Sequence, residues 1–139
     1  PSKEMLALKP DGRGDVTETH IAWRTRQSAP YVPSPIAVGD YFLAVSDGGI
    51  ASCFEAKTGK RHWQNRMGKG HSSAPVTAGG LVYFVSDAGV TRVVRPGPQF
   101  KLVAENLIGE RTYASPAISR SQIFIRGKKH LFCIGKNPK

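Results

Sequence analysis

PIAVGDYFLAVSDGG, residues 35–49, repeats without a gap as PVTAGGLVYFVSDAG at residues 75–89, 40 residues further along the chain. A third and looser copy begins at Ser115-Pro116-Ala117-Ile118 and continues through residues 123–134. A repeat of this length that is rich in β-branched and aromatic residues is typical of a β-propeller, in which each repeat forms one blade. The sequence therefore predicts an all-β propeller of four-stranded antiparallel blades, about three of them in this chain.

Each copy divides into four short strands. In the first copy, residues 35–38 and 41–45 are apolar runs joined by a Gly-Asp turn, which is a hairpin pattern. The turn at residues 46–49 supplies glycine where the backbone needs a positive φ, and residues 50–54 and 60–64 follow as the third and fourth strands. Proline opens each first strand, and because proline cannot donate to a ladder, we expect that strand to be an edge.

Two tryptophans occupy the same position in the repeat. Trp23 lies twelve residues before Pro35, and Trp63 lies twelve residues before Pro75. The third copy has Val103 at this position. A bulky residue at one fixed point of each fourth strand is expected to pack against the neighbouring blade, so we interpret Trp23 and Trp63 as structural rather than as ligand-stacking residues.

The segment Phe54-Glu55-Ala56-Lys57-Thr58-Gly59-Lys60-Arg61-His62-Trp63 resembles the Ala-x-Asp-Ala-x-Thr-Gly-x-x-x-Trp signature of the pyrroloquinoline quinone-like (PQQ-like) propeller repeats. The chain departs from this signature at Glu55, and the second copy has Arg95-Pro96-Gly97-Pro98 where the Thr-Gly turn is usual. The resemblance covers nearly the whole chain. It implies four-stranded blades around a channel, similar to the C-terminal blades of a barrel-assembly lipoprotein.

The resemblance also bears on function. The family includes scaffold propellers that work outside the cytoplasm, in the periplasm or as secreted proteins, and quinoprotein dehydrogenases with an adjacent-cysteine disulfide and an acidic calcium site. This sequence has no adjacent cysteines. We therefore expect a non-catalytic binding or scaffold propeller without a cofactor, which takes protein, saccharide or another anionic ligand. The alternative is the C-terminal part of a quinoprotein dehydrogenase whose catalytic residues lie outside this chain.

Strand counting predicts incomplete blades at both ends of the sequence. We assign residues 1–27 to the outer strands of one blade, 28–66 and 67–106 to two whole blades, 107–135 to an incomplete blade and 136–139 to a tail. Uncovered sheet edges invite pairing, so missing N-terminal blades or a second copy are expected to complete the ring. Light scattering tests the second-copy version, in which residues 21–25 of one chain complete the last blade of another. There is no apolar run of the length that a membrane span needs.

Charge is the main signal besides the repeat. Twenty Lys and Arg against ten Asp and Glu give a formal charge of +10, and no acidic residue follows Glu110. Such an excess attracts anionic partners, but we favour the interpretation that the basic residues lie on solvent-facing turns of a larger protein. Nucleic acid is not the expected partner, because no aromatic residues alternate with the basic ones.

The sequence shows no catalytic or metal-binding constellation. The four histidines lack metal-site spacing, and no nucleophile-elbow or phosphate-loop pattern occurs. Cys53 and Cys133 hold equivalent positions on third strands two blades apart, which excludes a disulfide, and we interpret both as small buried hydrophobes. We predict neither a catalytic nor a metal site.

Propeller geometry indicates where a ligand would bind. Loops from fourth to first strands share one face with the turns between second and third strands, and functional residues concentrate on such loops. The predicted ligand-binding residues at this channel mouth are Tyr31, Lys69, His71, Arg111 and Tyr113, beside Asp47 and Asp87. Two alternatives stay open here: the two aspartates serve as ordinary turn residues, and Tyr31 and Tyr113 pack between blades.

Overall fold

The structure, a computed structural model, describes residues 3–135. Within this range the chain forms thirteen β-strands and no helix, so it contains no helix long and apolar enough to cross a membrane. The strands are β1 (Met5–Leu8), β2 (Ile21–Thr25), β3 (Ile36–Val38), β4 (Tyr41–Val45), β5 (Ile50–Glu55), β6 (Arg61–Arg66), β7 (Val76–Ala78), β8 (Leu81–Val85), β9 (Val90–Arg95), β10 (Lys101–Leu107), β11 (Ala117–Ser119), β12 (Gln122–Arg126) and β13 (Leu131–Gly135).

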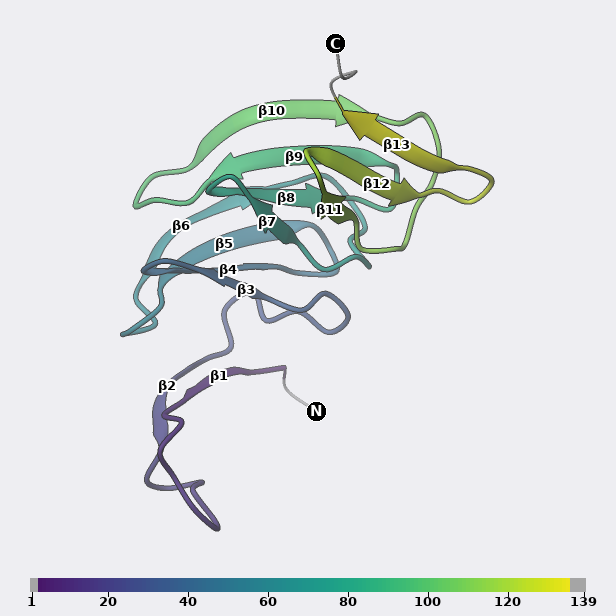
Figure 1. The fold of residues 1–139 in the computed structure, drawn as a ribbon. Helices are drawn as coiled ribbons and strands as arrows, with labels where there is room; N and C mark the ends of the chain where they lie inside the picture. The colour runs from purple at the N-terminus through teal and green to yellow at the C-terminus, as the bar shows by residue number, and fades with distance from the viewer. Residues whose placement is uncertain (1–2, 136–139) are drawn as a thin grey trace.

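The strands form four antiparallel sheets, one after another along the chain (Figure 1). Sheet 1 is β1-β2, sheet 2 is β3-β4-β5-β6, sheet 3 is β7-β8-β9-β10 and sheet 4 is β11-β12-β13. Each sheet is an up-and-down meander, and the strands that follow Pro35, Pro75 and Pro116 all lie at a sheet edge. The architecture is that of a partial β-propeller, and the predicted fold class is confirmed.

The turn between the second and third strands is built in the same way in sheets 2 and 3. Gly49 and Gly89 have φ of 83° and 80°, a region that costs glycine little. Ser46 and Ser86 accept hydrogen bonds at their Oγ atoms from the backbone N–H of Ile50 and Val90. The Ser-Asp-x-Gly sequence thus supplies both the backbone freedom and the side-chain acceptor that the turn needs.

The core lies between neighbouring sheets. Leu43, Val45 and Cys53 of sheet 2 join one buried cluster with Val82 and Phe84 of sheet 3. Because side chains of a strand alternate between its two faces, each inner sheet contributes apolar residues to the interfaces on both of its sides. The thiol of Cys53 is completely buried, and this burial raises its pKa to about 11, so it stays protonated in the core.

Both tryptophans lie between sheets. Trp23 donates from Nε1 to the carbonyl of Ala56, 2.8 Å away, and Trp63 donates in the same way to Gly97 at 3.0 Å. A Cβ on Gly59 would lie 2.6 Å from the Trp23 ring. The Thr-Gly turn of one repeat therefore packs closely against the indole of the repeat before it. This contact explains why the turn carries glycine at position 59.

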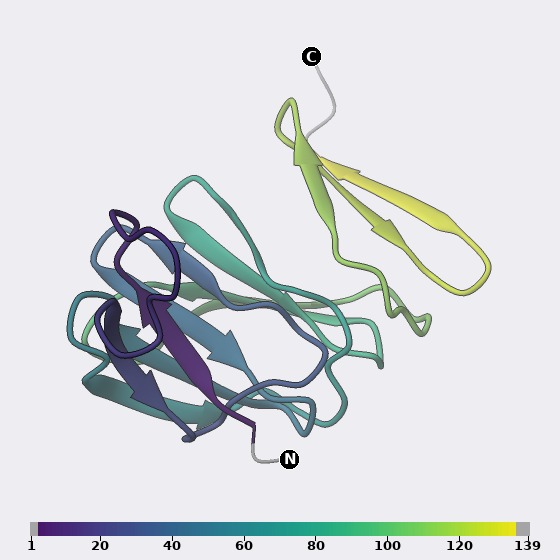
Figure 2. The same cartoon turned by 90° about the horizontal axis from the view of Figure 1, so that it is seen from below.

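Sheet 4 packs less closely than the others. Figure 2 shows β11–β13 standing apart from the remaining sheets, with contact to sheet 3 through the first strands β7 and β11. An apolar hollow of about 330 Å³ lies between Tyr83, Val93 and Ile125. Val103, predicted to match the two tryptophans, is 45% exposed and lies at the bulge between Leu102 and Ala104. By strand register the matching residue is Ala104, which pairs with Val93 as Trp63 pairs with Cys53. The prediction of Val103 at this position is therefore wrong, and sheet 3 has no bulky residue there.

Cys133 corrects one expectation from the sequence. It pairs with Phe124 as Cys53 pairs with Leu43, so the two cysteines do occupy equivalent register positions, and both thiols are free. Cys53 is buried because sheet 3 covers it, whereas Cys133 is exposed because no described residue covers that face of sheet 4. The prediction that both are buried is wrong for Cys133.

Candidate ligand-binding face

The candidate site lies where the connections between sheets meet the turns between second and third strands. We call this surface the loop face; its connections comprise residues 26–35, 46–49, 67–75, 86–89, 108–116 and 127–130. Backbone hydrogen bonds join the linkers 67–75 and 108–116 to the turns beside them. His71 N donates to Asp47 O at 3.0 Å, and Thr112 N donates to Asp87 O at 3.2 Å. The backbone of the loop face is therefore fixed by main-chain contacts.

Asp47 and Asp87 hold linkers in place. The Asp47 carboxylate accepts from Tyr31 N at 2.8 Å and Val32 N at 3.0 Å, and Lys3 Nζ lies 3.1 Å away. Partial burial alone would raise the pKa of Asp47, but these hydrogen bonds outweigh it and hold the pKa below its usual value. Asp87 accepts from Ser72 N at 2.8 Å and from Ser72 Oγ at 3.2 Å. Both carboxylates thus orient backbone amides.

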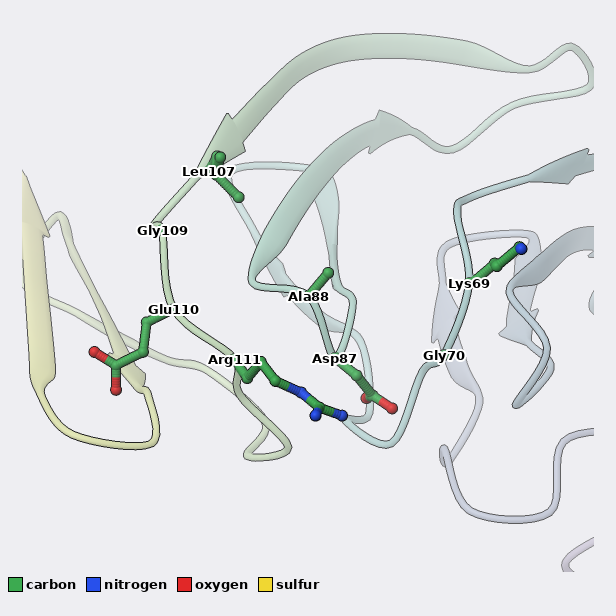
Figure 3. Close-up of a pocket in the computed structure, with 8 residues that line it drawn as sticks. All are labelled: Lys69, Gly70, Asp87, Ala88, Leu107, Gly109, Glu110 and Arg111. Atoms are coloured by element: carbon green, nitrogen blue, oxygen red, sulfur yellow. The ribbon is translucent and has the colours of Figure 1, made fainter.

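Lys69 and Arg111 line one open hollow of about 570 Å³ (Figure 3). The floor between them is the turn at Asp87 and Ala88, and Glu110 lies on the far side of Arg111. In Figure 3 the Arg111 side chain extends toward Asp87, whereas that of Glu110 points away from it. The structure therefore brings two of the predicted basic residues to the same depression.

The two predicted tyrosines lie on the loop face and are strongly exposed. Tyr113 is 54% exposed and lies under the guanidinium of Arg111, with 5.5 Å between Cζ and the ring centroid. Tyr31 is 79% exposed, and Lys3 Nζ lies 5.2 Å from its ring centroid. Their exposure excludes the alternative in which they pack between blades, and each ring is instead paired with a cation.

The ring of His71 is buried, although its backbone belongs to the loop face. It is only 2% exposed, and its Nδ1 has no hydrogen-bond partner among the described residues. Burial lowers the pKa of His71; the nearby Asp87 opposes this shift and Arg92 adds to it, so the ring stays neutral in the core. His71 is therefore not available on the surface to a ligand, and the remaining four predicted residues make up the exposed set.

Sequence reasoning missed Arg126 and Lys128 as members of this surface. Together with Arg111 and Tyr113 they line a second hollow of about 340 Å³, between the linker that precedes β11 and the β12–β13 turn. A comparison of equivalent repeat positions would have found them. The second copy has Val85 and Asp87 where the third copy has Arg126 and Lys128, so only the third copy is basic at these two positions.

Glu110 organises the β12–β13 turn. Its carboxylate accepts from the backbone N–H groups of Lys129 and His130, and its Oε2 lies 2.8 Å from His130 Nδ1. These contacts, the Lys129 amide first, lower the pKa of Glu110 to about 2 from the ordinary value of 4.5. The carboxylate is thus ionised, and committed to this turn, over the whole physiological range.

We predict that the β12–β13 turn loosens when Glu110 is protonated. Because the pKa of Glu110 is lower in the folded chain, its contribution to stability is present above pH 4.5 and is lost as the pH falls toward 2. The amide proton shifts of Lys129 and His130 should therefore titrate with a midpoint near 2. Glu110→Gln should abolish this titration, and a midpoint near 4.5 in the parent chain would contradict the assignment.

Comparison with known proteins places the fold. The sequence matches the model of the family described as outer membrane protein assembly factor BamB over residues 12–96, more than half of the chain. The crystal structure of BamB from Moraxella catarrhalis has a TM-score of 0.61 and 16% sequence identity to this chain, of which it covers 81%. The chain spans 33% of the length of that structure. No curated protein matches the sequence. The family match and the shared propeller fold together show that this chain belongs to the BamB family of PQQ-like repeat proteins.

Proposed function

We propose that the chain is part of a non-catalytic scaffold propeller that binds an acidic, extended protein segment across the loop face. The family description, outer membrane protein assembly factor, supports a scaffold role and a location outside the cytoplasm. Fold alone does not define a ligand, so the proposal rests on the surface itself.

The observation that carries the proposal is the pairing of exposed tyrosines with cations on a rigid surface. Tyr31 with Lys3 and Tyr113 with Arg111 present aromatic area and positive charge together, and Lys69 lies in the hollow beside Arg111. Tyrosine and arginine are enriched among the residues that dominate protein interfaces. An acidic segment with apolar side chains complements such a surface in charge and offers apolar groups to its exposed rings.

A titration with a short peptide of alternating glutamate and phenylalanine tests the proposal. Saturable shifts in the backbone amide NMR signals are expected around Tyr31, Lys69 and Tyr113. Tyr113→Ala together with Tyr31→Ala should weaken binding about tenfold or more, since each truncation removes an exposed interface residue.

The matched control removes aromatic area at the other end of the strands. Tyr41 lies beside the β5–β6 turn with His62, 5.6 Å between ring centroids, and Tyr41→Ala should leave peptide binding unchanged. Equal losses in the double variant and in the control would overturn the proposal. So would the same shifts with a lysine–phenylalanine peptide, because the charge argument requires an acidic ligand.

Closure of the ring stays a prediction. Within residues 3–135, the outer edges of β1 and β13 have no neighbouring strand, and Leu8 and Leu131 are exposed beside them. We propose that further blades or a second copy of the chain cover these edges, since unpaired edges with apolar residues favour association.

A further inference from the structure

The third repeat carries a basic notch on the loop face, formed by Arg111, Tyr113, Arg126 and Lys128 around the hollow of about 340 Å³. Every charged residue that lines this hollow is a cation. Among residues 3–135, none of the three cations takes part in a salt bridge. Their positive charges therefore add without local neutralisation by an ion pair.

Two hydrogen bonds fix the backbone from which these cations extend. Lys128 N donates to Arg111 O at 2.8 Å, and the hydroxyl of Thr112 donates to Arg126 O at 2.6 Å. The linker and the β12–β13 turn are thus joined by two hydrogen bonds among the residues that line the hollow. Because the backbones are already in place, binding a ligand does not require the backbone to be ordered, and the conformational cost falls on the side-chain ends.

The second repeat has the same backbone arrangement without the cations. Asp87 N donates to Gly70 O at 2.9 Å, and Ser73 Oγ donates to Val85 O at 2.7 Å. Arg111, Arg126 and Lys128 thus stand where the second repeat has glycine, a buried valine and an aspartate. The same fold forms with and without positive charge at these positions. The stability of the turn therefore does not explain why the three residues are cations.

The nearby carboxylates have other partners. Glu110 lies under the same turn, but its oxygens accept from Lys129 N, His130 N and the His130 ring. Asp87, toward which Arg111 extends in Figure 3, accepts two hydrogen bonds from Ser72. Neither carboxylate lines the basic notch.

We propose that the basic notch binds a phosphate group, either free or as a phosphomonoester. Two guanidinium groups present planar pairs of N–H donors that match phosphate oxygens, and the ammonium of Lys128 adds a third cation. Tyr113 also lines the hollow, and its hydroxyl is a further, neutral hydrogen-bond donor. Three cations around one hollow favour a dianion such as phosphate. A single carboxylate, the anionic group of the peptide in the proposed function, carries only one charge. The inference goes beyond the proposed function because it concerns a small anion and needs no protein partner.

Titration of the full chain with inorganic phosphate, followed through backbone amide NMR signals at constant ionic strength, tests the proposal. Saturable shifts are expected at residues 111–113 and 126–128. The test variant gives the notch the residues of the second repeat, Arg126→Val with Lys128→Asp, and should weaken phosphate binding at least tenfold. Lys128→Gln, a milder change at an exposed turn, should weaken it severalfold and serves if the double variant does not fold.

The matched control makes the same charge change at the opposite end of the strands. Arg95→Val with Lys57→Asp also replaces one arginine and one lysine at exposed positions, and should alter phosphate binding less than twofold. Non-saturable shifts, equal losses in the test and control variants, or equal saturation by chloride would each overturn the proposal. An acidic peptide that saturates the notch where phosphate does not would overturn it too, while leaving the scaffold proposal intact.

Two further titrations identify the kind of molecule that carries the phosphate group. A sugar phosphate that binds more tightly than inorganic phosphate, with the same loss in the test variant, would point to a phosphorylated saccharide. Vesicles containing phosphatidate, compared with vesicles of phosphatidylcholine alone, test a lipid headgroup in the same way. In either case the shifts at residues 126–128 must persist, since binding elsewhere on the molecule would contradict the notch as the site.

Discussion

Replacing Trp63 with alanine should lower the free energy of unfolding by about 3–5 kcal/mol, the range for large aromatic residues removed from a core. The indole is only 9% exposed, meets the ring of Phe100 edge-on at 5.1 Å and donates to Gly97 O. The variant loses the apolar contact and also leaves that carbonyl without its strongest donor. Chemical denaturation followed by far-UV circular dichroism measures the change.

Two companion variants separate packing from hydrogen bonding. Trp63→Phe keeps an aromatic ring but loses the N–H, and should cost about 1–2 kcal/mol. Val103→Ala truncates a half-exposed apolar residue on the corresponding fourth strand of sheet 3, and should cost less than about 1 kcal/mol. An unchanged denaturation midpoint for Trp63→Ala would contradict the packing role of Trp63. It would also contradict the alignment of the repeats on which that role is based.

Gly89→Ala is expected to cost about 3–5 kcal/mol, as the sum of left-handed backbone strain and steric overlap. Gly89 has a φ of 80°, and a Cβ there would lie 2.0 Å from the carbonyl oxygen of Glu110. The linker cannot move away easily, because Ile108 N donates to Gly89 O at 3.1 Å. Thermal unfolding of the variant tests this value.

Gly79→Ala is the control for the strain alone. Gly79 also has a positive φ, of 58°, but no other atom lies within 4 Å of a Cβ built there. Its substitution should cost about 1–2 kcal/mol. If the two alanine variants lose the same stability, the contact between the linker and the turn is not what demands glycine at position 89.

The features that recur at a fixed spacing could be predicted from the sequence. Proline at the start of each first strand, the Ser-Asp-x-Gly turn and the paired tryptophans each report one local constraint that the fold applies in every repeat. Local constraints of this kind appear in the sequence because a single residue type satisfies them. The same reasoning identified Lys69 and Arg111 as neighbours, since they follow equivalent strands.

The exposure of individual side chains could not be predicted in this way. His71 was placed on the surface, yet its backbone is joined to Asp47 and its ring lies in the core. Thr112, the matching residue of the next repeat, is also buried, so the position faces inward in both. Cys133 shows the opposite case, because its exposure depends on what covers sheet 4, and no pattern within one repeat contains that information.

The basic notch escaped prediction for a related reason. The β12–β13 turn is one residue shorter than its counterparts: Gly127–His130 lie between the paired residues Arg126 and Leu131, where Ser86–Val90 lie between Val85 and Thr91. The missing residue follows Lys128, so Arg126 and Lys128 still match Val85 and Asp87 by their spacing from the proline. What spacing alone does not show is that these two side chains line a hollow together with the linker that precedes β11.

The main-chain bonds that join linkers to turns have a consequence for how such a surface diversifies. The bonds from His71 N to Asp47 O and from Thr112 N to Asp87 O use no side-chain atoms of the linkers, so they do not depend on which residue other than proline stands at these positions. Lineages can therefore exchange the outward residues of one repeat without rebuilding its neighbours. Duplicated units of this kind are free to acquire separate specificities, and the exposed positions of the loop face offer a natural starting point for randomised libraries.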